Sequence, residues 1–178
     1  VKRLIEEKGF EKVVTGDGVK VLVPAPEVNL LLLSSHILKH AFGVGIGLRQ
    51  FCDYAVARRY YKGRVNEEEM REIWRMTGLE KWQGLLEGFV TGCLGERCHS
   101  ERSEESFYKK KTDVLLDIVL KGGNFGVYSK DRENVPRARW ARKVQTFKAL
   151  MGNIGFAFRY APGEWFWTTM QLLGGQFR

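Results

Sequence analysis

Apolar residues along the chain follow two different periods. In the stretch EKVVTGDGVKVLVP, apolar and polar residues alternate on both sides of a Gly-Asp-Gly triplet, which is typical of two short strands joined by a tight turn. From residue 27 onward, apolar residues instead recur at the spacing of one helix face. The pattern predicts a mainly α chain, a multi-helix bundle with a small N-terminal β-hairpin, α+β overall.

Proline, glycine and a polar cap mark the predicted helix boundaries. A first long helix is expected over residues 27–40, after Pro26 and before a glycine-rich segment, and a second one over residues 48–61. Asn66 is a suitable N-cap for a third helix with an acidic first turn, which Gly78 ends. Further helices are expected over residues 79–94, 113–121 and 136–152, and from Pro162 onward.

The length of the chain fits one domain. Its 178 residues, 44% of them apolar, are ordinary for a globular protein with a single core. The expected parts are a helix end with the hairpin at 1–26, helices at 27–97, a low-complexity insertion or loop at 98–111, and C-terminal helices at 112–178. Residues 98–106, CHSERSEES, resemble the translation of a repetitive DNA element of some bacterial genomes. Because residues 1–9 have the pattern of the end of a helix, we expect further chain upstream.

Charge and cysteine content narrow the class of protein. Lys and Arg number 29 against 21 Asp and Glu. This net charge of +8 is explained either by an acidic partner, such as a phosphate-bearing ligand or nucleic acid, or by solubility alone. The three cysteines form no CxxC pair, which predicts reduced thiols and a cytoplasmic protein. The most apolar stretch, residues 30–33, is far shorter than the roughly 20 apolar residues that cross a bilayer, so we expect no membrane association.

Four polar side chains stand out where the first two long helices meet. His36 and His40 lie one turn apart on the first helix, and Arg49 and Asp53 lie one turn apart on the next. The short glycine-rich segment between them makes the two helices antiparallel neighbours. The spacing therefore predicts that the four side chains form one polar cluster.

Three interpretations of this cluster are open from the sequence. As a metal site it is incomplete: HxxxH supplies two ligands, Asp53 is the candidate for a third, and Ile37 stands where zinc proteases have a glutamate. We therefore expect no metal. A buried polar seam, in which Asp53 accepts hydrogen bonds from Arg49 and a histidine, is favoured. In the third interpretation, Lys39 and Arg49 bind a phosphate group. None of these patterns identifies a catalytic residue.

The same region resembles a known protein family. The stretch VPAPEVNLLLLSSHILKHAFGVGIGLRQFCDYA, with its HxxxH…LRxxxD run, and the later LKGGNFG resemble the region C-terminal to the catalytic core in the uncharacterised nucleotidyltransferase family, relatives of polymerase-β-type transferases. The resemblance implies a helical part that positions a nucleotide or substrate. It also implies a nucleoside triphosphate and Mg²⁺ as ligands, and a catalytic domain that precedes this region.

The sequence departs from that family where the acidic catalytic motif is needed. The only Asp-x-acidic pair is Asp131 with Glu133; no Gly-Ser turn precedes it, and Pro136 breaks the strand that would present it. We therefore expect this chain alone to be inactive. The alternative is a non-enzymatic helical interaction module that binds a partner protein or nucleic acid. Nucleic acid is not favoured, because the basic residues from Arg137 to Lys143 are better explained as a solvated face.

Overall fold

The computed structural model describes residues 2–42, 46–95, 113, 115–120, 148, 151–152 and 154–174. For residues 171–174 it describes the backbone only. Within these residues the chain is mostly helical and has one two-stranded antiparallel sheet, as the sequence pattern predicts. The elements are α1 (Lys2–Lys8), β1 (Phe10–Val14), β2 (Lys20–Pro24), α2 (Pro26–Phe42), α3 (Leu48–Tyr61), α4 (Glu67–Met76), α5 (Glu80–Leu94), α8 (Ile154–Tyr160) and α9 (Pro162–Gly174).

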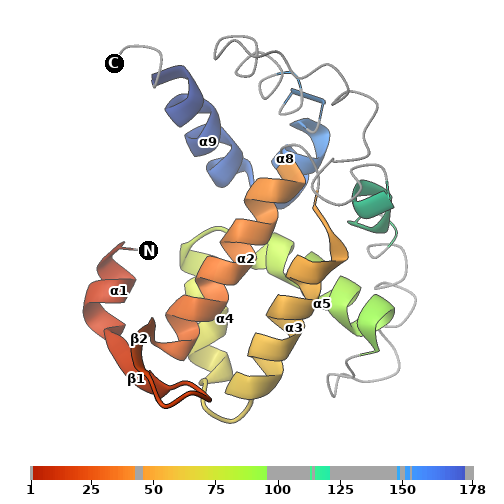
Figure 1. Ribbon diagram of the computed structural model, residues 1–178. Coiled ribbons are helices and arrows are strands. Elements are labelled where there is room, and N and C mark those ends of the chain that lie inside the picture. The colour runs from red at the N-terminus through yellow and green to blue at the C-terminus, as the bar shows by residue number, and fades with distance from the viewer. Residues whose placement is uncertain are drawn as a thin grey trace, which may run out of the picture.

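The N-terminal helix and hairpin form as their sequence patterns predict. Gly9 follows the end of α1 with a φ of 73°, a conformation that glycine adopts at little cost. Strand β1 pairs with β2 in antiparallel register, with Phe10 opposite Pro24 and Val14 opposite Lys20. Both α1 and β2 contact α2, and the hairpin lies at the N-terminal end of that helix (Figure 1).

Helix α2 lies in the middle of the hydrophobic core. It packs against α3, α5 and α8, and Figure 1 shows it running between the hairpin at one end and α8 at the other. Phe51 of α3 and Phe89 of α5 are fully buried, with ring centroids 4.4 Å apart. Burial of large side chains of this kind is the main source of stability in the core. The largest fully buried side chains also include Trp82, Tyr54, Phe42, Leu31 and Ile37.

Most helix boundaries agree with the sequence. Helix α3 has the predicted ends, and the Oδ1 atom of Asn66 accepts hydrogen bonds from the backbone N–H groups of Glu68 and Glu69, at 3.0 and 3.3 Å. Helix α8 was not predicted. The insertion at 98–111, the acidic pair at 131 and 133, and nearly all of the helix expected at 136–152 lie outside the described residues. Among the described residues, no helix has the length and apolar character needed to span a membrane.

Candidate functional site

A pocket of about 370 Å³ lies between α2 and α3, where the sequence predicts the polar cluster. His36 of α2 and Arg49 and Asp53 of α3 line it, together with Leu33, Ile37 and Gln50. We call it the histidine–arginine pocket. The two helices thus bring three of the four predicted side chains to one place, from positions separated by the glycine-rich segment.

His40 joins this cluster through His36. The Nε2 atoms of the two rings are 3.2 Å apart, and the rings meet edge to face with 4.5 Å between their centroids. A hydrogen bond between two imidazole nitrogens needs one donor and one acceptor, so at least one of the rings is neutral. Burial lowers the pKa of His40, and the neighbouring His36 lowers that pKa further. The arrangement therefore favours a neutral His40.

The cluster is not the buried seam that the sequence favoured. Arg49 and Asp53 are both exposed, and within the described part of the chain no hydrogen bond or ion pair joins them. The prediction that Asp53 accepts hydrogen bonds from Arg49 and a histidine is therefore wrong. Lys39 is exposed on α2 and does not line the pocket. The physical reason is that α3 turns a different face, with Phe51 and Tyr54, into the core.

Gln50 is the buried polar side chain of the histidine–arginine pocket. It is only 8% exposed, and its Oε1 atom has no hydrogen-bond partner among the described residues. A buried amide oxygen without a partner costs about 1–3 kcal/mol, so a donor group that reaches it is favourable. Within the described residues, no group of three or more His, Cys, Asp and Glu side chains is placed to hold a metal ion. The side chains that line the pocket can therefore bind a ligand through hydrogen bonds and through charge.

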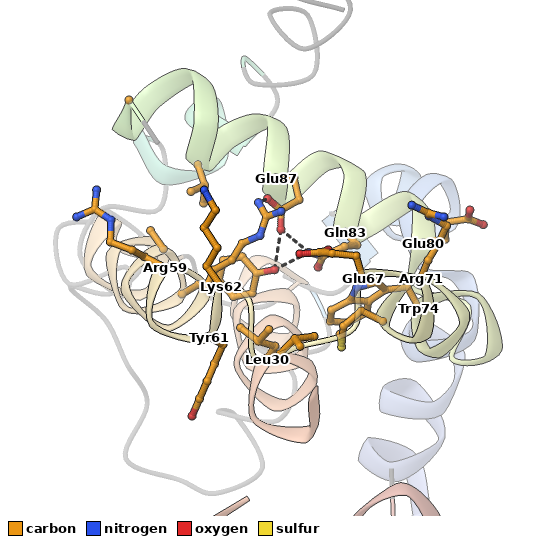
Figure 2. Close-up of a pocket in the computed structure, with 17 residues that line it drawn as sticks. Leu30, Arg59, Tyr61, Lys62, Glu67, Arg71, Trp74, Glu80, Gln83 and Glu87 are labelled. Carbon is orange, nitrogen blue, oxygen red and sulfur yellow. Dashed lines mark hydrogen bonds and ion pairs between the residues drawn. The ribbon is translucent and has the colours of Figure 1, made fainter. Parts of the chain in front are cut away.

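Among the described residues, a buried network of polar side chains lies instead between α3 and α5. The hydroxyl group of Tyr54 donates to Oε1 of Glu87 at 2.8 Å, and Nε2 of Gln83 donates to the same carboxylate oxygen at 2.6 Å and to the Tyr54 hydroxyl. Oε1 of Gln83 accepts from Ser34 at 3.2 Å, and the indole N–H of Trp82 donates to the Ser34 hydroxyl at 2.9 Å. Figure 2 shows the bonds among Tyr54, Gln83 and Glu87 as dashed lines. We call Tyr54, Gln83 and Glu87 the α3–α5 network.

A larger cleft, of about 770 Å³, lies over this network between α3, α4 and α5. Arg58 lines it and pairs with Glu87, which ties the network to the charged rim. The sequence pattern does not single out Arg58, Gln83 or Glu87. One signal was present: Tyr54 and Arg58 are four residues apart on one predicted helix, and so are Gln83 and Glu87 on another. Such pairs share a helix face, but the spacing alone does not show that the two faces meet.

Comparisons of the chain with models of protein families, with curated proteins and with solved structures give no match in any of the three.

Proposed function

We propose that this chain is the helical, nucleotide-positioning part of a nucleotidyltransferase-like protein, and that the histidine–arginine pocket contacts the nucleotide. One observation carries the proposal: His36, Arg49 and Asp53, which belong to the HxxxH…LRxxxD run, line a single pocket although they come from two helices. Arg49 and Asp53 are exposed and not paired with each other among the described residues, so the packing of α2 against α3 does not require them.

The pocket combines a cation with hydrogen-bond acceptors. The planar guanidinium group of Arg49 suits two parallel hydrogen bonds to a phosphate. The carboxylate of Asp53 and the amide oxygen of Gln50 would accept from sugar hydroxyl or base amino groups. Contact with His40 holds the ring of His36 in place. A volume of about 370 Å³ is at the lower end of the range for ligand pockets, so it suits part of a nucleotide rather than all of it.

Calorimetric titration of the chain with ATP and with CTP, each with Mg²⁺, tests this proposal. We expect measurable binding that Arg49→Gln weakens by about tenfold or more, because hydrogen bonds to charged groups contribute about 1.5–3 kcal/mol. Arg75→Gln is the matched control, since Arg75 is an exposed arginine of α4 that lines neither cavity. No heat at millimolar nucleotide, or equal affinity for the Arg49 and Arg75 variants, would contradict the proposal.

A second candidate function is a non-enzymatic interaction module, and exposed aromatic side chains favour it. On α9, Phe166 and Trp167 are 59% and 60% exposed, and on α8 the exposed ring of Phe158 lies 5.1 Å from that of Trp165. Large apolar side chains gathered at a surface are typical of protein contacts. Self-association in sedimentation velocity that Trp167→Glu abolishes would support this function, and a chain that stays monomeric would count against it.

The nucleic-acid form of this second function makes a separate prediction. Binding to an oligonucleotide would weaken steeply as salt rises, because phosphate contacts release counterions. A labelled oligonucleotide that the chain does not retard at low salt would exclude it.

A further inference from the structure

The cleft over the α3–α5 network is a different site from the histidine–arginine pocket. No residue that the structure describes lines both cavities. Helix α3 separates them, since Arg49 and Asp53 line the pocket while Tyr54 and Arg58 line the cleft. A ligand in the cleft would therefore be recognised by side chains that the proposed nucleotide contact does not use.

Part of the cleft lining is apolar. Leu30 of α2 and Met70 and Trp74 of α4 contribute it, and each of these residues is largely buried. Figure 2 shows Leu30 and Trp74 on the same side of the Gln83 side chain. The hydroxyl of Tyr54 and the amide of Gln83, which also line the cleft, are hydrogen-bonded within the α3–α5 network. Apolar lining of this kind favours a ligand with an aromatic or alicyclic body.

The charges around the cleft are distributed unevenly. On the α3 side the lining charges are Arg58, Arg59 and Lys62, all of them cations, whereas α4 and α5 contribute charges of both signs: Glu67, Arg71, Glu80 and Glu87. Figure 2 places Arg59 and Lys62 at one end of the view and Glu80 with Arg71 at the other. Arg58 is already paired with Glu87. Lys62 is exposed and makes no ion pair within the part of the chain that the structure describes. An anionic group is therefore best stabilised at the α3 side, against Lys62.

We propose that this cleft binds a small organic anion, one with an aromatic or alicyclic body over Leu30, Met70 and Trp74 and a carboxylate, sulfonate or phosphate group against Lys62. The volume of about 770 Å³ lies within the range of small-molecule sites. The body supplies apolar contact, and the anionic group fixes its orientation.

Titration with naphthalene-2-sulfonate, followed in amide proton–nitrogen NMR correlation spectra, tests the proposal on the full chain. We expect saturable shifts at cleft residues with a Kd of about 1 mM or below, as typical ligand efficiencies give for a molecule of this size. The matched probe is naphthalene-2-sulfonamide, which keeps the ring and lacks the charge. We expect it to bind about fivefold more weakly or worse, since it forms no charge-assisted contact with Lys62.

Two exposed lysines provide matched protein variants. Lys62→Glu should weaken binding of the sulfonate by about fivefold or more, whereas Lys81→Glu, on α5 but outside the cleft lining, should leave it unchanged. Spectra without probe check that both variants keep the fold. The proposal is overturned by shifts confined to residues outside the cleft, by equal affinity for the two probes, or by full affinity in Lys62→Glu.

Discussion

The hydroxyl group of Tyr54 joins α3 to α5, and its removal tests whether the α3–α5 network stabilises this fold. Tyr54 is only 1% exposed; its hydroxyl donates to Glu87 and accepts from Gln83. The substitution Tyr54→Phe keeps the aromatic ring in the core and deletes only the oxygen atom. The loss of stability therefore reports on two hydrogen bonds rather than on a cavity.

The expected loss follows from the partners that stay behind. A hydrogen bond to a charged group contributes about 1.5–3 kcal/mol and a neutral one about 1 kcal/mol, which gives an upper limit of about 4 kcal/mol. Gln83 keeps its bond to Glu87, and Glu87 keeps its ion pair with Arg58, so neither group is left unpaired. We expect the free energy of unfolding to fall by about 2–3 kcal/mol, or roughly 4–12 °C in Tm for a chain of this size.

Urea unfolding followed by far-ultraviolet circular dichroism measures this loss. Tyr60→Phe is the matched control, because Tyr60 lies on the same helix and is 59% exposed; it should change the free energy of unfolding by less than about 0.5 kcal/mol. A loss in Tyr54→Phe no larger than that of Tyr60→Phe would refute the reasoning, since it would mean that water replaces both bonds without cost.

Three other predictions concern α2, α3 and α4. Asp53→Ala should change the free energy of unfolding by less than about 0.5 kcal/mol because Asp53 is exposed, and a loss above about 2 kcal/mol in urea would contradict that placement. Asn66→Ala should cost about 1 kcal/mol, since it removes the N-cap of α4, and an unchanged thermal midpoint would show that the cap contributes nothing. Because folding lowers the pKa of His40 from 6.5, the unfolded chain binds a proton at this residue more readily than the folded chain does. The contribution of His40 to the free energy of unfolding is therefore full above about pH 6.5 and is lost as the pH falls through the lowered pKa. Urea midpoints at about pH 7.5 and pH 5 should show a smaller acid loss in His40→Gln than in the unsubstituted chain; equal losses would show that His40 does not cause it.

Local sequence signals are sufficient to predict most of the helices and strands that the structure describes. Helix α3 and the N-cap at Asn66 depend on glycine, proline and capping residues that act within a few positions of each boundary. Gly152 precedes helix α8 and Gly155 lies in its first turn; glycine lowers intrinsic helix propensity, so the pattern does not reveal this helix. Its buried residues Ala157 and Tyr160, and its contacts with α2 and α5, show that tertiary packing stabilises it.

The polar sites show where local signals stop. Arg49 with Asp53, and Tyr54 with Arg58, have the same four-residue spacing on α3, so periodicity gives both pairs equal weight. The structure distinguishes them through α5, because Glu87 meets Tyr54 from 33 positions further along the chain. That contact depends on the rotation of α5 about its own axis relative to α3, which neither helix encodes by itself. The first pair is consequently left at the surface, where a ligand can reach it, while the second forms the wall of the cleft.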